Sequence, residues 1–285
     1  MHFGLAIFPT ATSISPADLA RAAEERGFES LWFPEHSHIP ASRRTPFPGG
    51  GELPRMYYEV YEPFVALTAA AVATRRLRIG TGVCLLVQRD PIQTARSVVT
   101  LDRISGGRFL FGIGGGWNAE EMENHGTEFG SRFALLRERV EAVVRLFTEE
   151  RPEYHGRFVD FDPVVFEPKP LQKPHPPIHV GGGWPHAAGR AIRYGDGWMP
   201  IHGFGDLAGT IPRFREEVAA AGRDPAAIEV SVFGMGPDRG ALERYCEAGA
   251  DRVVFALPPR DRDAVLPLLD RCAGLAETFG SGATR

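Results

Sequence analysis

The chain has 285 residues, of which 43% are hydrophobic and 24% charged, and its formal net charge is −4 at pH 7. This composition supplies enough apolar surface for a packed core and excludes a disordered chain. It also lacks the excess of Lys and Arg that nucleic-acid-binding proteins usually carry. The most apolar stretch, residues 64–74, is too short to span a bilayer, so we expect neither a nucleic-acid nor a membrane partner.

Three scattered cysteines, Cys84, Cys246 and Cys272, argue against a disulfide framework and fit a reducing compartment. The N-terminal segment lacks the basic start and the longer apolar core of a signal peptide. We therefore expect a cytoplasmic protein. The length is compatible with one α/β barrel, and we expect residues 1–285 to form a single domain.

Strand and helix patterns alternate along the first half of the chain. A helix starts at Ser15-Pro16, where a serine cap precedes a first-turn proline, and ends before Gly27. A long polar loop rich in Pro and Gly covers residues 34–58. Strands are expected at residues 2–8, 29–33, 77–83 and 108–113, and further helices at 62–74, 90–105 and 132–149.

Residues 151–176 interrupt this alternation and are predicted to be a hairpin insertion, because they are rich in proline, β-branched and aromatic residues. Strands then follow at residues 177–180, at a segment led by residues 195–198, at 228–234 and at 251–256, with helices at 185–194, 206–221, 238–248 and 261–277. Eight strand–helix units in a chain of this length predict a (β/α)8 TIM barrel rather than an open sheet.

Active sites of such barrels lie at the carboxyl ends of the strands. Two glycine clusters directly follow strands, one at residues 114–116 and one at residues 181–183. A glycine-rich turn that opens a helix lets the backbone approach a ligand and presents N–H groups to an anion. Neither cluster has the spacing of a dinucleotide or P-loop fingerprint. The alternative is that each cluster is a tight turn with no ligand.

Glu35 and His36 follow the second strand and can supply an acid or a base. The alternative is a polar pair on a surface loop. His38 lies close by in the sequence, but no third ligand is evident, so we expect no metal site. Arg43, Arg44 and Arg55 of the same loop can meet an anionic ligand or be solvated loop charges.

Six segments, taken in order and spacing, resemble the luciferase-like family of flavin- or deazaflavin-dependent (β/α)8 barrels. They are residues 31–36, 78–83, 102–109, 112–121, 177–183 and 195–198. The resemblance extends over nearly the full length. Segments 114–121 and 193–198 are more similar to the branch that uses the deazaflavin coenzyme F420 than to the FMN monooxygenases.

The resemblance implies roles for individual residues. His36 matches a histidine that some members use as a proton donor, and Glu35 matches an acidic group near the cofactor ring. Gly82 and Val83 lie where the family often has a non-prolyl cis peptide that supports this ring, and Cys84 follows them, although a cysteine after an apolar strand is more often a core residue.

The two glycine clusters also match parts of the family's cofactor site. Gly182, Gly183 and Trp184 match the turn whose N–H groups hold the cofactor phosphate. Gly115, Gly116 and Glu120 match the neighbouring wall. Some sugar-phosphate dehydrogenases of the family use a glutamate at the position of Trp117, so the change to tryptophan favours reduction of an activated double bond over oxidation of an alcohol.

Three hypotheses remain for the function. The first is an F420-dependent oxidoreductase that transfers a hydride between the deazaflavin and a small organic substrate. The second is a two-component FMN monooxygenase supplied by a separate flavin reductase, and the third is a non-catalytic flavin-binding or carrier protein. The resemblance also implies a homodimer. Loop 34–58 and insertion 151–176 are expected to cover the pocket and to set specificity.

Overall fold

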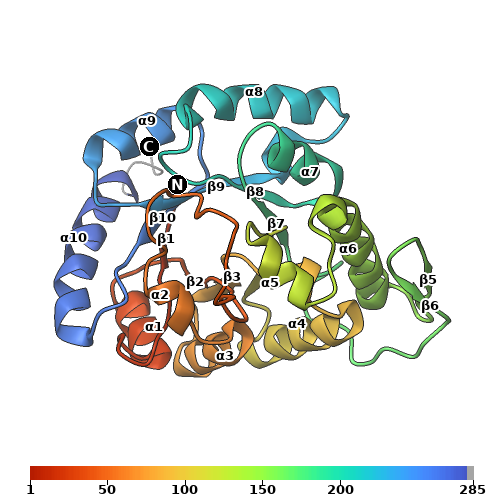
Figure 1. Cartoon of the computed structure of the whole chain (residues 1–285). Coiled ribbons are helices and arrows are strands. Elements are labelled where there is room, and N and C mark those ends of the chain that lie inside the picture. The colour runs from red at the N-terminus through yellow and green to blue at the C-terminus, as the bar shows by residue number, and fades with distance from the viewer. Residues whose placement is uncertain (281–285) are drawn as a thin grey trace.

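The computed structural model describes residues 1–280, and residues 281–285 of the expected single domain lie outside the described part. Eight parallel strands close into a barrel in the order β1-β10-β9-β8-β7-β4-β3-β2, surrounded by helices (Figure 1). This arrangement confirms the predicted (β/α)8 barrel. The strands are β1 (His2–Ala6), β2 (Ser30–Phe33), β3 (Arg78–Thr81), β4 (Phe109–Ile113), β7 (Ile178–Gly181), β8 (Gly197–Met199), β9 (Glu229–Met235) and β10 (Arg252–Ala256).

The helices begin where the sequence supplies a cap. Helix α1 (Pro16–Glu25) opens on Ser15, whose side chain accepts a hydrogen bond from the Asp18 N–H. Helix α4 (Pro91–Ser105) opens on Asp90 in the same way and ends at Gly106, which has a φ of 70°. The others are α3 (Pro63–Ala73), α6 (Arg132–Thr148), α7 (His186–Tyr194), α8 (Leu207–Ala220), α9 (Arg239–Glu247) and α10 (Arg262–Gly280).

These eight helices agree with the sequence prediction to within a few residues, but several shorter helices were not predicted. They are α2 (Met56–Glu59), α5 (Ala119–Asn124) and the 3-10 turns η1 (Leu86–Gln88), η2 (Phe129–Ser131) and η3 (Pro225–Ala227). Each is too short to show a helical period in the sequence. Within residues 1–280, no helix combines the length and apolar character needed to cross a bilayer.

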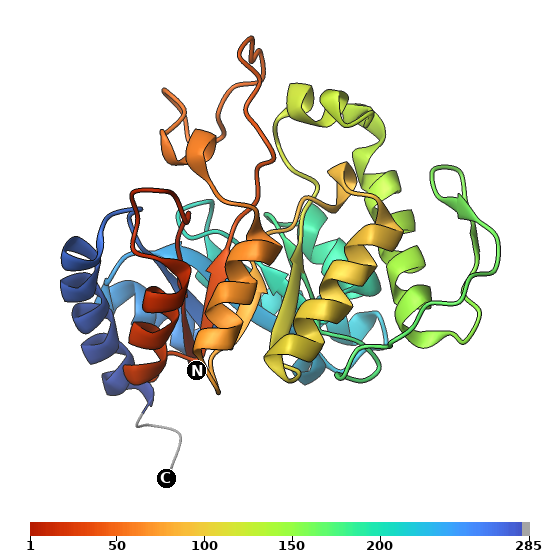
Figure 2. The ribbon, with the colours of Figure 1, turned by 90° about the horizontal axis from the view of Figure 1, so that it is seen from below.

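The insertion is a two-stranded hairpin, as predicted, formed by β5 (Tyr154–His155) and β6 (Asp160–Phe161). The Glu138 carboxylate of α6 accepts hydrogen bonds from the backbone N–H groups of residues 157–159. Farther along, Lys169 Nζ donates to the carbonyl of Leu146 near the end of α6. The hairpin therefore lies on the flank of the barrel (Figure 2). Arg96 and Arg103 of α4 also donate to the carbonyls of Glu167 and Lys169. The expectation that the insertion covers the pocket is wrong, because α6 and α4 hold it at the side.

The barrel interior is filled in two layers. Trp32, Leu110, Met199, Phe233 and Val254 form an apolar plug, with the partly buried Ala6 and Val83 packed against it. Arg252 lies at the amino-terminal end of the strands, where its guanidinium donates to Glu29 and Glu229. The lower half of the barrel is thus closed, so a ligand has to bind above the plug, at the carboxyl ends of the strands.

Two segments rise above these carboxyl ends. Residues 34–62, with α2 in them, extend from the end of β2, and α5 extends from the end of β4 on the same side (Figure 2). The N-terminus lies at the opposite end of the barrel. The loop expected to cover the pocket therefore does lie over the barrel mouth.

Candidate active site

His36 forms a buried pair with Glu121. The His36 Nδ1 and Glu121 Oε2 atoms are 2.7 Å apart, and the exposed fractions of the two side chains are 6% and 1%. The other carboxylate oxygen of Glu121 accepts a hydrogen bond from the Ser37 N–H at 2.9 Å. Burial alone would raise the pKa of Glu121, but the hydrogen bond and the charge of His36 bring it below its ordinary value. Glu121 is therefore an anionic partner that fixes the ring of His36.

Aromatic rings enclose the rest of the imidazole. The ring centroids of Tyr57 and Trp117 lie 5.2 Å and 5.7 Å from that of His36, and Phe47 contacts both rings. Nε2 of His36 has no hydrogen-bond partner among residues 1–280. With Nδ1 held by a carboxylate, Nε2 is the nitrogen that remains available for a proton transfer.

Glu35, next to His36, has both carboxylate oxygens occupied by the protein. One oxygen accepts a hydrogen bond from the Leu85 N–H, and the other from Arg89 Nε, each at 2.6 Å. Glu35 is buried, and it ties the end of β2 to the segment that follows β3. Its position suits a residue that shapes the site rather than one that exchanges protons there.

The segment after β3 contains the non-prolyl cis peptide that the resemblance implied, at Gly82–Val83. The Val83 side chain lies between the ends of two other strands, because a Cβ added at Gly114 or at Gly181 would lie 2.6 Å or 2.7 Å from its methyl groups. Cys84 is fully buried, and burial, with the charge of Glu35, raises the pKa of its thiol well above the ordinary value. Val83 is therefore the residue of this segment that faces the mouth.

The first glycine cluster is explained by packing. A Cβ at Gly115 would lie 2.6 Å from the Phe133 ring, and one at Gly116 would lie 2.7 Å from the Met122 side chain. Gly116 also has a φ of 63°, which favours glycine. These contacts support the tight-turn alternative, and the role of Gly115 and Gly116 in holding a cofactor stays a prediction.

The second glycine cluster is open at its last residue, Gly183. Gly183 is exposed, and a Cβ added there would meet no atom within 4 Å. Gly182 has a φ of 125°, and its carbonyl accepts a hydrogen bond from Trp198 Nε1 at 2.8 Å. Within the described residues, the N–H groups of Gly183 and Trp184 donate to no backbone carbonyl. This turn thus presents free donors at the start of α7, as an anion site requires.

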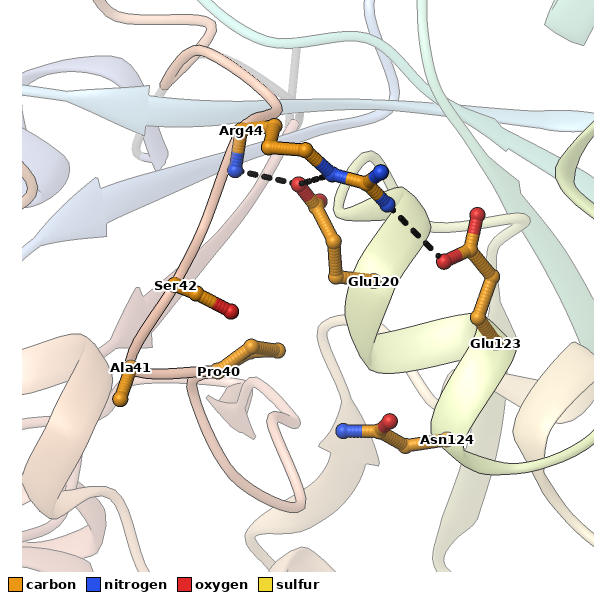
Figure 3. A pocket seen from close by; sticks show the side chains of 7 residues that line it. All are labelled: Pro40, Ala41, Ser42, Arg44, Glu120, Glu123 and Asn124. Atoms are coloured by element: carbon orange, nitrogen blue, oxygen red, sulfur yellow. Dashed lines mark hydrogen bonds and ion pairs between the residues drawn. The ribbon is translucent and has the colours of Figure 1, made fainter.

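Glu120 fastens the loop over the mouth. Its carboxylate accepts hydrogen bonds from the hydroxyl of Thr45 and from the Arg44 N–H. Figure 3 shows Arg44 beside Glu120 and Glu123, and its guanidinium also donates to Glu123. Burial raises the pKa of Glu120, but the hydrogen bonds from Thr45 and Arg44 bring it to about 2. Arg44, Glu120 and Glu123 border a hollow of about 490 Å³, which is also lined by Pro40, Ala41, Ser42 and Asn124. In this structure Glu120 holds the protein's own loop, and its contact with a cofactor stays a prediction.

His38 does not join a metal site in the structure. Its Nδ1 contacts the Ser37 hydroxyl at 2.9 Å and its Nε2 the Asn124 side chain at 2.8 Å. Among the described residues, no group of three or more His, Cys, Asp or Glu side chains has an arrangement that could hold a metal ion.

Comparison with known proteins identifies the family. The model of the family described as "Luciferase-like monooxygenase" matches residues 10–236. The chain belongs to the luciferase-like monooxygenase family. It is accordingly an enzyme of the oxidoreductase or monooxygenase kind, as the sequence led us to expect.

This luciferase-like chain is similar to proteins from several bacteria. The uncharacterized protein Rv0953c of Mycobacterium tuberculosis is 39% identical over 96% of this chain and 98% of its own length. The F420-dependent glucose-6-phosphate dehydrogenase of Kineococcus radiotolerans is 31% identical over 76% of this chain and 61% of its own length. The crystal structure of the monooxygenase RslO1 from Streptomyces bottropensis matches with a TM-score of 0.82 and 23% identity, over 98% of this chain and 100% of that one.

Sequence reasoning missed the most important neighbour of His36 in this luciferase-like site. The predicted site included Glu120, whereas the carboxylate that contacts His36 belongs to Glu121. The two glutamates are adjacent in α5, a helix that the sequence did not reveal. A helical turn at this position would have separated their directions by about 100° and shown that only one of them can point to His36.

Proposed function

We propose that this enzyme is an F420-dependent oxidoreductase that transfers a hydride between the deazaflavin and a small organic substrate, with His36 exchanging the proton. The observation that carries the proposal is the buried His36–Glu121 pair at the carboxyl ends of the strands, with Nε2 of His36 unpartnered within residues 1–280. The F420-dependent relative, which is 31% identical over most of this chain, supports the choice of cofactor.

The residues present fit an anionic cofactor that carries a flat ring. The turn at Gly182, Gly183 and Trp184 offers the backbone N–H groups of Gly183 and Trp184, which would hold its phosphate, while the N–H of Gly182 donates to the Met199 carbonyl. Val83, partly exposed above the apolar plug, offers a surface for the ring. When bound, the deazaflavin supplies or accepts the hydride.

His36 can exchange a proton in either direction. The Glu121 carboxylate accepts a hydrogen bond from Nδ1 and stabilises a positive charge on the ring, so that Nε2 can donate a proton when the imidazole is charged and accept one when it is neutral. The rings of Tyr57 and Trp117 pack against the imidazole and help to fix its position. Since Trp117 occupies the position of a glutamate base in some relatives, we propose reduction of an activated double bond as the direction of reaction.

The first experiment is a fluorescence titration with F420, followed by turnover measurements on His36→Gln and on the matched control His38→Gln. We expect the wild type to quench F420 fluorescence. His36→Gln should retain affinity within a factor of about two and lose turnover by about 10²-fold or more, as expected for removal of a general acid. His38→Gln, two residues along the same loop, should keep both properties.

Other outcomes discriminate the remaining hypotheses. Oxygen consumption with reduced FMN and a flavin reductase, without F420 binding, would instead support the two-component monooxygenase. Cofactor binding that is unaffected by His36→Gln, with no turnover in a screen of activated double bonds, would support the non-catalytic carrier.

We also propose that the enzyme is a homodimer of the cytoplasm. Helix α3 exposes two valines on one face, Val65 and Val72, whose exposed fractions are 73% and 70%. Apolar side chains two turns apart favour burial against a second copy of the chain. Cys84, Cys246 and Cys272 are all free thiols, which is typical of a reducing compartment.

A further inference from the structure

A second hollow, of about 450 Å³, lies between α6 and α7 on the outside of the barrel. We call it the arginine groove. Phe133 and Arg137 of α6 form one side, and His186, Arg190, Arg193 and Tyr194 of α7 form the other. Pro185, which precedes α7, also lines the groove, so the groove adjoins the open turn with Gly183.

The basic residues of α7 lie in one row. His186, Arg190 and Arg193 are separated by four and three positions, which places them on one face of the helix. A ligand group bound at the turn would therefore have the guanidinium groups of Arg190 and Arg193 along the next two helical turns.

The positive charge of the groove is poorly neutralised by the protein. Within residues 1–280, neither Arg190 nor Arg193 has an ion pair or hydrogen bond with a carboxylate, whereas Arg137 has Glu141 at 3.7 Å. The Arg190 guanidinium stacks on the Phe133 ring at 3.9 Å, and its buried Nε has no hydrogen-bond partner. The buried hydroxyl of Tyr194 also has none. Burial lowers the pKa of Arg190, and the neighbouring charge of Arg193 adds to this effect.

Arginines of the loop over the mouth differ in this respect. Arg44 is paired with Glu120 and Glu123, and Arg55 with Glu59. Arg43 donates to the backbone of Thr45 and stacks on Trp117. Compared with the loop arginines, Arg190 and Arg193 of the groove therefore have more guanidinium donors free to bind an anionic ligand.

We propose that the arginine groove binds the oligoglutamate tail of F420, with Arg190 and Arg193 as partners of its carboxylates. This inference rests on the proposed function, because the tail continues beyond the phosphate that the turn at Gly183 would hold. Guanidinium groups bind carboxylates through two parallel hydrogen bonds, which suits a chain of repeated carboxylates. The tail would thus supply the anions that this cluster of like charges lacks.

The test compares the dissociation constants of three ligands by fluorescence. They are F420 with a long glutamate tail, F420 with a single glutamate, and the deazaflavin alcohol that lacks both phosphate and tail. We expect the wild type to bind the long-tailed form at least about fivefold more tightly than the single-glutamate form, the gain of two partly exposed ion pairs. The double variant Arg190→Gln/Arg193→Gln should lose this preference and keep its affinity for the tail-less ligand.

Matched controls separate the groove from general charge effects. Arg239→Gln/Arg244→Gln removes the same charge from α9, outside the groove, and should bind all three ligands as the wild type does. Arg193 is exposed, so Arg193→Gln alone removes no buried contact, and it should weaken binding of the long-tailed form by about threefold.

The results distinguish this inference from the proposed function. Equal affinity for long and short tails in the wild type, or an unchanged preference in both groove variants, would overturn the tail site and leave the proposed function intact. Failure of the wild type to bind any of the three ligands would overturn the proposed function together with the tail site. If the double variant also binds the tail-less ligand more weakly, the substitution has disturbed the fold. The tail site is then tested by whether Arg193→Gln alone weakens binding of the long-tailed form.

Discussion

At the scale of single residues, two adjacent glutamates of α5 contact different parts of the protein. Glu121 points to His36 and Ser37, and Glu120 to Arg44 and Thr45. Their directions differ because neighbouring residues of a helix are separated by about 100° around its axis. One glutamate therefore fixes the proposed proton-exchanging residue, and the other fixes the loop that carries it.

Replacing Glu121 by Gln should impair His36 without removing it. The amide can still accept the hydrogen bond from Nδ1, but it does not stabilise a positive charge on the ring. We expect turnover to fall by about 10-fold to 10²-fold, with the affinity for F420 within a factor of about two of the wild type. Steady-state rates measured with substrate in excess, beside a fluorescence titration with F420, test this expectation.

Glu123→Gln is the matched control for that experiment, since Glu123 is an exposed residue of the same helix that pairs with Arg44. It should retain the turnover rate of the wild type. A Glu121→Gln enzyme with wild-type turnover would show that the carboxylate does not act through His36.

At the same scale, the sequence predicts the site incompletely. The resemblance brought out His36 and the cis peptide at Gly82–Val83, because both lie in short recognisable segments. Glu121 lies 85 residues from His36, and only the closure of the barrel brings the two together. A single sequence contains no measure of that distance.

At the scale of elements, the two glycine clusters show a second limit of sequence reasoning. Both clusters follow strands and have similar sequences. In the structure, residues 114–116 are packed against Phe133, Met122 and Val83, whereas Gly183 faces open space. The difference comes from the helices that cover each turn. The strand–helix units themselves were predictable, because hydrophobic period and capping residues are local properties.

The prediction on oligomeric state concerns helix α3. We expect the wild type to elute as a particle of twice 31.2 kDa, and Val65→Glu/Val72→Glu to elute as a monomer with an unchanged circular dichroism spectrum, because two charges would be buried in the interface. Light scattering coupled to size-exclusion chromatography measures both masses.

Val165→Glu serves as the control, because Val165 is an equally exposed valine of the insertion, with an exposed fraction of 81%. It should elute with the wild type. A monomeric wild type, or a dimer that survives both α3 substitutions, would contradict the proposed interface.

At the scale of the whole molecule, the closed end of the barrel contains a buried histidine. Both ring nitrogens of His179 lack hydrogen-bond partners among the described residues, and the Glu229 carboxylate is 3.6 Å away. Burial, with the charge of Arg252, lowers the pKa of His179 to about 3. The folded protein therefore keeps this ring neutral well into the acidic range.

This histidine should make the protein sensitive to acid. An unfolded chain binds a proton at His179 near pH ~6.5, whereas the folded chain does not. Between that pH and the folded pKa of about 3, the free energy of unfolding should fall as the pH is lowered, by up to about 1.4 kcal/mol per pH unit from this residue.

Urea unfolding of the wild type and of His179→Gln over this pH range tests the effect. The variant should have a shallower dependence on pH, because glutamine does not take up a proton. His2→Gln, a substitution of an exposed histidine, should follow the wild-type curve. Parallel curves for the wild type and His179→Gln would assign the acid sensitivity to other groups.

The paired anchoring of the mouth loop by α5 constrains how relatives of this enzyme can be recombined. Residues 34–62 and α5 are distant in the chain but joined through Glu120 and Glu121. A chimera whose crossover falls between the two segments would combine a histidine from one parent with a carboxylate from the other. To change the substrate specificity, residues 34–62 and α5 should therefore be exchanged together.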